Sequence, residues 1–260
     1  MSDYNFRPLA SLDDVEPLRA ARVETLAAPP ELFIEQFVGR SAVYAIECDG
    51  VIGYLTDLDG TLTELFVVPE HRTHVDAVLK LATESLGLKY AWASTLDPIA
   101  LAACTCVSSE FSVVGFQFRT LHAVTLPTPD PLPVERIADL SDVDRVRAAN
   151  HPEVFDEPTD IPIWLENGWV TLFELSDDVA GFGLCTPAGP HTRGADIGIR
   201  VCDSHQRRGL GAWIVQRMAS LAQSKGLIPT AGCGLENTVS RRTLERAGFV
   251  ADHRLLRFNL

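Results

Sequence analysis

The sequence contains an internal repeat, and this constrains its fold more than any other feature. Residues 7–24 align with residues 135–152 at an offset of 128 positions. The identical pairs in this alignment are Ala10/Ala138, Leu12/Leu140, Asp14/Asp142, Val15/Val143, Arg19/Arg147, Ala20/Ala148 and Ala21/Ala149. Two later matches follow in the same order at offsets of 134 and 133, namely 66–82 with 200–216 and Gly115–Phe116 with Gly248–Phe249. Any two α/β segments share some apolar spacing, but identity across the first helix favours duplication of one unit.

A proline-rich stretch separates the two copies. The segment 126–135, LPTPDPLPVE, has proline at every second position from 127 to 133. Proline fixes φ and lacks a backbone donor, so this stretch is predicted to be an extended linker. We therefore expect a first domain over 1–126, a linker over 127–134 and a second domain over 135–260.

Both copies show the same order of predicted elements. A helix is followed by three strand-like runs, a long amphipathic helix, a further strand, a short helix and terminal strands. The strand-like runs are 42–47, 51–58 and 62–68 in the first copy, and 169–175, 179–186 and 195–201 in the second. Asp49–Gly50 and Asp59–Gly60 are strong hairpin signals, and Gly87 is a natural helix stop. The pattern predicts an α+β fold, built twice from an antiparallel meander and a strand–helix–strand crossover.

Composition narrows the functional class. The net charge of −13 argues against a nucleic-acid-binding surface. No apolar run approaches the ~18 residues that a membrane span needs, and residues 1–7 lack a signal-peptide pattern, so a cytoplasmic location is expected. The six cysteines form no C-x-x-C pair, which makes a structural metal improbable.

A glycine turn in the second copy has the chemistry of an anion site. In HQRRGLGAW (205–213) two arginines lead into two glycines at the start of a predicted helix. Unpaired N–H groups and the positive end of the helix dipole favour a phosphate there, and glycine lets it approach closely. The alternative is a plain turn with two solvated arginines. The first copy reads EHRTHVDAV (70–78) and keeps the helix without glycines, so the glycines indicate a ligand requirement.

These residues resemble the GNAT superfamily of acetyl-CoA-dependent N-acyltransferases. Gln206–Gly211 is similar to that family's [Q/R]-x-x-G-x-[G/A] motif, and ENTVSRRTLERAGF (236–249) to its N-x-x-S-x-x-x-L-x-x-x-G-F ending. The resemblance implies that backbone amides over 207–212 hold the pyrophosphate of acetyl-CoA. It implies that the strand end at Ile199–Val201 pairs with the pantetheine arm. Asn237 would contact that arm, cap a helix, or do both. The implied binding residues are Ile199, Val201, Gln206, Arg207, Arg208, Gly209, Leu210, Gly211, Ala212 and Asn237.

The catalytic groups are less well marked. The resemblance implies a carboxylate base on a central strand; Asp196 and Glu174 are the candidates, although a strand Asp is also compatible with a hairpin-end charge. Many relatives use a tyrosine as acid, but Leu244 occupies that position and all four tyrosines lie in the first copy. Either the thiolate leaves without an acid, which its moderate basicity allows, or the first copy supplies one. Cys202 is expected to pack against neighbouring residues and not to act as a nucleophile.

The sequence thus predicts two tandem GNAT-like units, with a degenerate first copy and an acetyl-CoA-binding second copy. The expected reaction is direct acetyl transfer to a primary amine of a small molecule or peptide, without a metal. The alternatives are a non-catalytic acyl-CoA-binding sensor and, within the class, a mycothiol-synthase-like acetyltransferase. The acidic, aromatic segment 150–168 fits either an acceptor site for a cationic amine or a solvated loop. No nucleic-acid or membrane partner is expected, and an exposed strand edge in either half would allow a homodimer.

Overall fold

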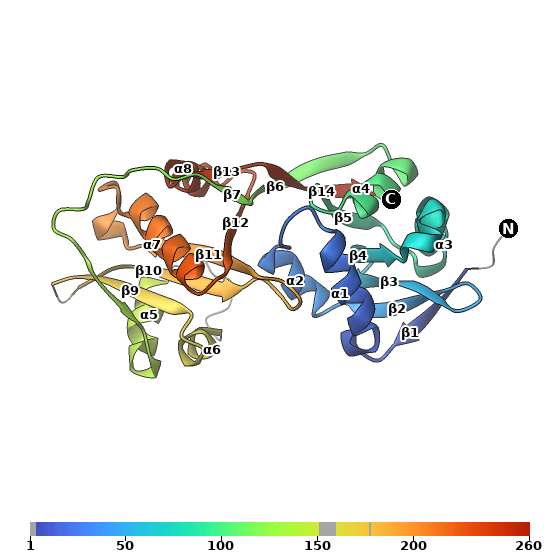
Figure 1. Cartoon of the computed structure of the whole chain (residues 1–260), viewed down its shortest axis with the longest axis horizontal. Coiled ribbons are helices and arrows are strands. Elements are labelled where there is room, and N and C mark those ends of the chain that lie inside the picture. Colours follow the sequence, from blue (N-terminus) through green and yellow to red (C-terminus); the bar gives the residue numbers. More distant parts are fainter. Residues whose placement is uncertain (1–3, 151–159, 177) are drawn as a thin grey trace.

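The computed structural model describes residues 4–150, 160–176 and 178–260, and twelve of the described strands form one continuous sheet (Figure 1). Their order is β1-β2-β3-β4-β5-β14-β6-β12-β11-β10-β9-β8. A separate two-stranded ribbon pairs β13 with β7. The predicted α+β class with a mostly antiparallel sheet is confirmed.

The first half begins with the predicted meander. Its strands are β1 (Asn5–Leu9), β2 (Ala42–Glu47), β3 (Val51–Leu58), β4 (Thr61–Val67), β5 (Tyr90–Ser94), β6 (Phe111–Phe118) and β7 (Thr120–Leu121). Its helices are α1 (Glu16–Thr25), α2 (Leu32–Val38), α3 (Val75–Leu86) and α4 (Pro98–Val107). Asp49–Gly50 and Asp59–Gly60 have positive φ at all four residues. This backbone twist suits tight hairpins, which is why these pairs join β2, β3 and β4.

The second half repeats this order. Its strands are β8 (Val134–Ile137), β9 (Val170–Leu175), β10 (Asp178–Pro187), β11 (Gly194–Val201), β12 (Ile228–Gly234), β13 (Phe249–Val250) and β14 (His253–Asn259). Its helices are α5 (Val143–Ala149), α6 (Ile161–Glu166), α7 (Leu210–Ser224) and α8 (Thr238–Arg246). None of the helices in the described ranges is long and apolar enough to cross a membrane.

The two halves share strands at the centre of the sheet. The last strand of the chain, β14, lies between β5 and β6 and pairs antiparallel with both. Strand β6, from the first half, pairs on its other side with β12 of the second half. The main-chain ladder therefore runs without interruption through the boundary between the halves, as the centre of Figure 1 shows.

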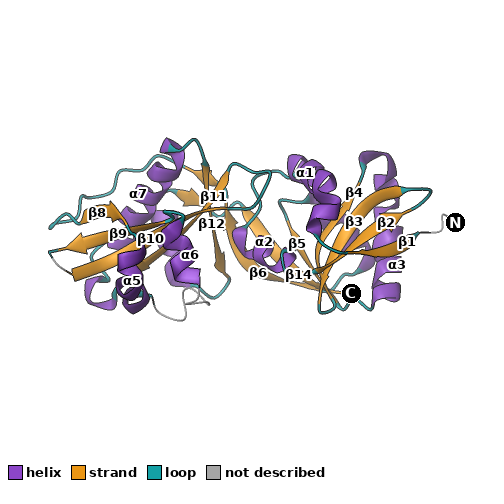
Figure 2. Cartoon of the chain, turned by 90° about the horizontal axis from the view of Figure 1, so that it is seen from below, coloured by secondary structure: helices purple, strands orange, loops and turns teal. Residues whose placement is uncertain are grey.

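Helices cover both faces of the sheet. In the second half α7 lies on one side, and α5 and α6 lie on the other (Figure 2). The α7 side buries Ile197 and Val201 of β11 against Ile214 and Met218, whereas Phe182 of β10 belongs to the core beneath α5 and α6. Alternate residues of β11 therefore point away from α7, and Asp196 is one of them.

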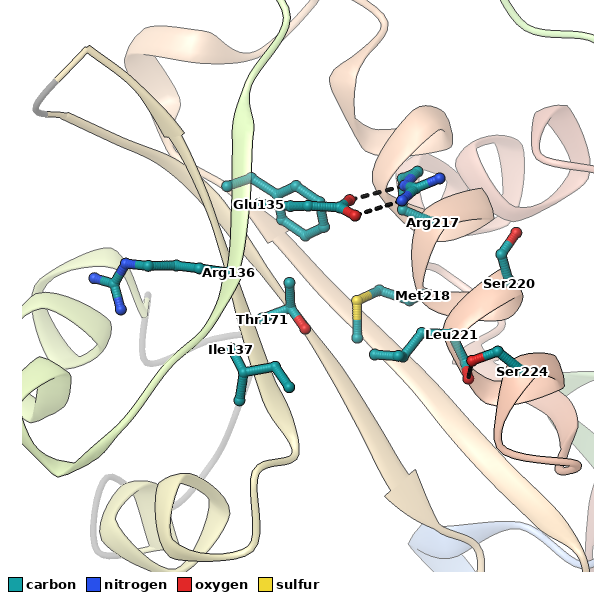
Figure 3. A pocket seen from close by; sticks show the side chains of 10 residues that line it. Glu135, Arg136, Ile137, Thr171, Arg217, Met218, Ser220, Leu221 and Ser224 are labelled. Carbon is teal, nitrogen blue, oxygen red and sulfur yellow. Dashed lines mark hydrogen bonds and ion pairs between the residues drawn. The ribbon is translucent and has the colours of Figure 1, made fainter.

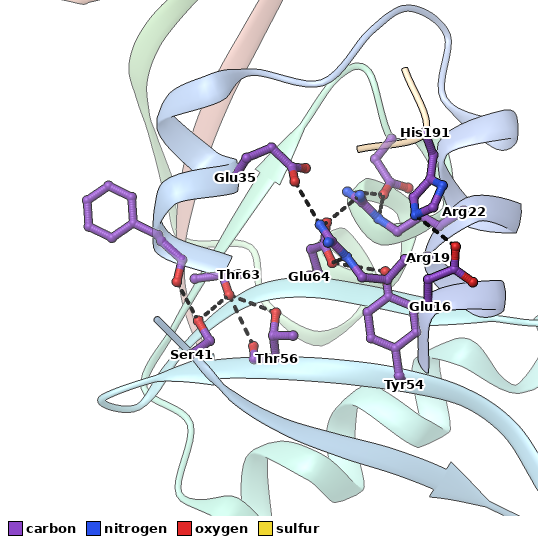
Figure 4. Close-up of polar contacts among 12 residues, drawn as sticks. Glu16, Arg19, Arg22, Glu35, Ser41, Tyr54, Thr56, Thr63, Glu64 and His191 are labelled. Atoms are coloured by element: carbon purple, nitrogen blue, oxygen red, sulfur yellow. Dashed lines mark hydrogen bonds and ion pairs between the residues drawn. The ribbon is translucent and has the colours of Figure 1, made fainter. Parts of the chain in front are cut away.

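A charged cluster is buried where α1 and α2 meet β4 (Figure 4). The side chain of Glu64 is fully buried and accepts hydrogen bonds from Arg22 at 2.7 Å and Arg19 at 3.3 Å. The hydroxyl of Tyr54 donates to the same carboxylate at 2.9 Å. Arg19 also donates to Glu35 of α2 at 2.7 Å. Because a buried charge needs a partner, this cluster fixes α1 and α2 against the sheet.

Candidate active site

The glycine turn forms an open helix N-terminus. Strand β11 ends at Val201, and after a short 3-10 turn helix α7 begins at Leu210 with Gly209 as its N-cap. Arg207 and Gly209 have φ values of +62° and +82°. The first backbone bond of the helix runs from the N–H of Trp213 to the carbonyl of Gly209 at 3.4 Å. The amides before Trp213 are therefore free of helical partners, as an anion site requires.

Hydrogen bonds of Gln206 and His205 fix the turn on one side, and its other side is open at Gly209. The side-chain amide of Gln206 donates to the carbonyl of Val201 at 3.2 Å and to Asp203 at 2.8 Å. The buried His205 has its Nε2 2.9 Å from a carboxylate oxygen of Asp178. A Cβ added at Gly209 would meet no atom within 4 Å, so the space above the turn is unfilled. Arg207 and Arg208 are both exposed beside it.

Helices α7 and α8 meet closely at the second glycine. A Cβ at Gly211 would lie 3.1 Å from the methyl group of Thr243, so this glycine permits the contact. Leu210 and Ala212 are buried in the core beneath. The exposed Asn237 caps α8, with its side-chain oxygen accepting from the N–H of Ser240 at 3.0 Å. Both glycines of the predicted motif thus have a visible physical role.

Strands β11 and β12 diverge before β11 reaches this turn. Their parallel pairing covers Gly194–Asp196 and Ile228–Thr230 only, after which β12 pairs with β6. The backbone of β11 from Ile197 onward therefore lacks a partner on that side within the described residues. Ile199 and Val201, two predicted binding residues, lie on this free segment. Their edge is available to an extended ligand arm in the manner of an added strand.

Asp196 stands at the point of divergence, in a cavity of about 460 Å³. The cavity is lined by Glu31, Phe33, Trp92, Val114, Gly115, Asp196, Gly232, Cys233, Gly234, Leu255 and Arg257. No hydrogen bond or ion pair joins the Asp196 carboxylate to another described side chain. Burial, with the nearby charge of Glu31, raises its pKa to about 7 against the opposing effect of Arg119. A carboxylate with this pKa is suited to accept a proton near neutrality.

The first half contributes a second carboxylate to the same cavity. Glu31 precedes α2, and its carboxylate accepts a hydrogen bond from Gln117 at 2.5 Å. Burial raises the pKa of Glu31, while Arg119 and Gln117 act in the opposite direction. A Cβ on Gly232 of β12 would lie 2.1 Å from a Glu31 oxygen. Glycine at this position is therefore what allows the carboxylate to reach the sheet.

Arg119 holds the Glu31 loop against the second half. Its Nε donates to the carbonyl of Pro29 at 2.8 Å and its Nη1 to the carbonyl of Ala231 at 2.9 Å. Its Nη2 lies 4.0 Å from Glu31, is buried and has no hydrogen-bond partner in the described part of the chain. Sequence reasoning missed Glu31 and Arg119. The Pro29–Pro30 pair signals a helix start, but nothing local links it to a strand two hundred residues away.

Glu174, the second candidate base, lies elsewhere. It pairs with Val179 of β10, seven positions along that strand from Thr186, the partner of Asp196. Its carboxylate forms ion pairs with Arg136 at 3.0 Å and Arg145 at 2.6 Å. Despite some burial, these hydrogen bonds lower the pKa of Glu174. The structure does not bring it together with Asp196.

The remaining sequence signals can also be placed. Leu244, in the position where relatives have tyrosine, is buried in the core shared by α7 and α8. Cys202 is half-buried, and burial raises its pKa, which makes it a poor nucleophile. Of the acidic segment at 150–168, residues 151–159 lie outside the described residues. The first-half counterpart of the glycine turn has His74 before α3, with an ordinary φ of −108°.

A second cavity, of about 430 Å³, lies in the second half on the side of the sheet that α7 covers (Figure 3). It opens between α7 and the strands β8 and β9, with Phe173, Met218 and Leu221 in its wall. An ion pair between Glu135 and Arg217 crosses one end of it. Asp196 faces away from α7, so this cavity is separate from the one that contains the candidate base.

Comparison with known proteins agrees with this architecture. A family model described as "Acetyltransferase (GNAT) domain" matches residues 11–121, and one described as "Acetyltransferase (GNAT) family" matches residues 135–249. A search of curated proteins gives no match.

Solved structures match almost the whole chain. A GNAT-family acetyltransferase from Colwellia psychrerythraea has a TM-score of 0.88 at 17% identity, with 98% of this chain and 99% of that chain covered. A GCN5-related N-acetyltransferase from Sphaerobacter thermophilus has a TM-score of 0.62 at 15% identity, with 98% and 95% covered. A tandem GNAT protein of the clavulanic acid biosynthesis pathway has a TM-score of 0.58 at 15% identity, with 98% and 97% covered. At these identities the structures support the fold alone. Together with the two family models, they establish that this chain is a tandem GNAT protein and an acyltransferase.

Proposed function

We propose that the protein transfers an acetyl group from acetyl-CoA to a primary amine, with the second half as the catalytic unit. The observation that carries this proposal is the position of Asp196. It lies where β11 and β12 diverge, on the sheet face opposite α7, with a cavity beside it. The anion-binding turn at 206–211 follows the same strand. One strand thus leads from a site for a pyrophosphate to a site for a proton acceptor.

Acetyl-CoA fits the residues at the turn. The amides over 207–212 and the exposed Arg207 and Arg208 would hold its pyrophosphate. The free edge of β11 at Ile199–Val201 would pair with the pantetheine arm, and Asn237 would lie beside that arm while capping α8. When bound, acetyl-CoA supplies an activated thioester carbonyl. The open space at Gly209 and the positive φ there support this assignment.

The chemistry then needs the acceptor nitrogen to lose two protons, one before and one after the new bond forms. An amine arrives as an ammonium ion, and Asp196 accepts its proton directly or through a water molecule. The free amine nitrogen forms a bond to the thioester carbonyl carbon, the carbon–sulfur bond breaks, and CoA leaves as a thiolate. The second proton then passes from the nitrogen to that thiolate or to solvent, which leaves a neutral amide and CoA. Leu244 offers no proton, and the moderate basicity of a thiolate allows it to leave without a dedicated acid. Asp196, unlike Glu174, faces the cavity where the amine would lie.

Gly209→Asp tests the cofactor site. We expect it to weaken acetyl-CoA binding at least about 10-fold, because a carboxylate would face the pyrophosphate. The matched control is Gly209→Asn, which has nearly the same shape, tolerates positive φ and carries no charge. Isothermal titration with acetyl-CoA measures both variants. Equal affinities for Gly209→Asp and Gly209→Asn would refute the anion-site assignment.

Acetyl transfer itself is tested by thiol release from acetyl-CoA over a panel of amines. Release with at least one amine, and formation of the corresponding amide, is expected. Tight CoA binding without release for every amine would instead support an acyl-CoA-binding sensor. A cytoplasmic location and a homodimer stay predictions from the sequence.

A further inference from the structure

The cavity beside Asp196 continues over a strip of sheet that carries no side chains. Gly232 and Gly234 of β12 and Gly115 of β6 all line it, and Gly234 pairs directly with Gly115. A Cβ at Gly234 would meet no atom within 4 Å. Helix α2 lies beside this strip and contributes Phe33 to the cavity, together with its N-cap residue Glu31. The Glu31 carboxylate lies over Gly232, and the open space over Gly234 beyond it leaves room for a molecule to lie along the sheet between the halves.

Two aromatic side chains and an arginine line the end of the cavity that is farther from Asp196. Trp92 of β5 and Arg257 of β14 are direct cross-strand partners and therefore share one face of the sheet. The ring of Phe33 stacks on Trp92, with 5.7 Å between their centroids. The guanidinium of Arg257 lies over the ring of Tyr90 at 4.1 Å. Within the described ranges no carboxylate pairs with this exposed arginine.

The strand register gives the separation of the two ends. From Asp196 the path crosses β12 and β6 to β14, and it advances along the strands to the level of Arg257. With ~4.8 Å for each of three strand steps and ~3.3 Å for each of six residues, the two Cα atoms are about 24 Å apart. The long arginine side chain reduces the span that a ligand must cover. An extended chain of about five residues, ~17 Å long, covers the span that remains after the arginine side chain is taken into account.

We propose that the acceptor is an elongated molecule with a primary amine at one end and an anionic group at the other. The inference rests on the proposed acetyl transfer. The amine lies between Asp196 and Glu31, whose negative charge attracts an ammonium ion. An apolar middle portion contacts Phe33 and Trp92, and Arg257 binds the anionic group. A short extended peptide with a free amino terminus and a free carboxylate has this chemistry.

The first half consequently selects the acceptor. Glu31, Phe33 and Trp92 all belong to it, whereas the anion-binding turn and Asp196 belong to the second half. The charged cluster around Glu64 fixes α2 through the hydrogen bond between Arg19 and Glu35. Because α2 carries Phe33, the cluster also fixes one side of the cavity, which we call the acceptor groove. The half without the glycine turn is therefore part of the acceptor site.

A pair of pentapeptides tests the proposal: Gly-Gly-Gly-Phe-Gly as the free acid and as the carboxyl-terminal amide. We expect kcat/KM for acetylation to be at least about 10-fold higher for the acid. In Arg257→Gln the value for the acid should fall to that for the amide. The matched control, Arg7→Gln, removes an exposed arginine at the far edge of the sheet and should retain the preference. Equal values for the two peptides in the wild type, or a preference that survives Arg257→Gln, would overturn the proposal.

Direct binding separates this proposal from acetyl transfer. Isothermal titration of the acid peptide into CoA-loaded protein should show binding that Gly234→Leu weakens at least about 10-fold, because leucine would fill the open space over that glycine. Intact CoA binding by Gly234→Leu confirms that the variant is folded. Peptide binding without acetylation of the peptide or of any amine in the panel would refute the proposed acetyl transfer and leave the groove assignment standing. Undiminished peptide binding by folded Gly234→Leu would refute the groove assignment.

Discussion

Asp196→Asn is expected to lower kcat/KM for amine acetylation by a factor of about 10² to 10⁴ while leaving acetyl-CoA affinity near that of the wild type. Asparagine keeps the shape of the side chain but cannot accept a proton from the incoming ammonium. The measurement is steady-state kinetics together with titration of acetyl-CoA. Glu174→Gln is the matched control, since it neutralises the other candidate carboxylate, which lies among arginines at the other end of the strands. Comparable losses in both variants would contradict the assignment.

The same residue predicts the pH dependence. The pKa of Asp196 is raised to about 7, so the base is protonated and inactive below that pH. We expect the kcat/KM of the wild type to rise as pH increases through about 7. The kcat/KM of Asp196→Asn should lack this pH dependence. When folding raises the pKa of a carboxylate, the charged form destabilises the folded protein. The free energy of unfolding therefore falls as pH rises from the unfolded to the folded pKa of that group. Asp196→Asn should thus be at least as stable as the wild type at pH 8, which excludes unfolding as the cause of lost activity.

Glu64→Gln is expected to lower the free energy of unfolding by about 3–5 kcal/mol. The substitution leaves the buried Arg19 and Arg22 facing a neutral amide in place of the carboxylate between them. Chemical denaturation at pH 7 measures the loss. The exposed pair of Arg7 and Glu47 provides the control, because Glu47→Gln breaks a bond of similar length, 2.7 Å, in solvent and should have no measurable effect.

Acid should reduce the difference between Glu64→Gln and the wild type. The two arginines hold the pKa of Glu64 below its ordinary value despite its burial. A lowered pKa stabilises the folded protein above the unfolded pKa and ceases to do so as pH falls through the folded value. A pH-independent difference between the two proteins would show that the loss comes from packing and not from charge.

Local sequence signals predicted most of the individual elements. The Asp-Gly pairs identified the hairpins because their backbone must adopt positive φ. Gly87 ends α3 in the left-handed conformation, as its position after an amphipathic run predicted. Asp196 and the glycine turn were predicted as site residues because they lie in one strand–turn–helix segment that resembles the GNAT superfamily, and their roles stay predictions. Each of these features depends on residues close together in sequence.

The remaining features depend on long-range pairing. The position of β14 beside β5 joins residues more than 160 positions apart, such as Leu255 and Ser94, and no local pattern reports it. Glu31 reaches the cavity only because that pairing brings the halves together. The acidic, aromatic segment 150–168 was compatible with either an acceptor site or a solvated loop. In the described part of the chain, Glu31, Phe33 and Trp92 give an acidic and aromatic lining to the cavity that contains Asp196.

The place of β14 also affects how the protein is made. A ribosome synthesises a chain from its amino terminus, yet the strand that separates β5 from β6 is made after all the other described strands. The 141 residues from the end of β6 at 118 to the end of β14 at 259 take about 7–28 s to translate at ~5–20 residues per second. Throughout that interval the edges of β5 and β6 that β14 later fills stay unpaired. Biosynthesis of the protein should therefore depend on holding chaperones more than that of a chain whose first domain closes early.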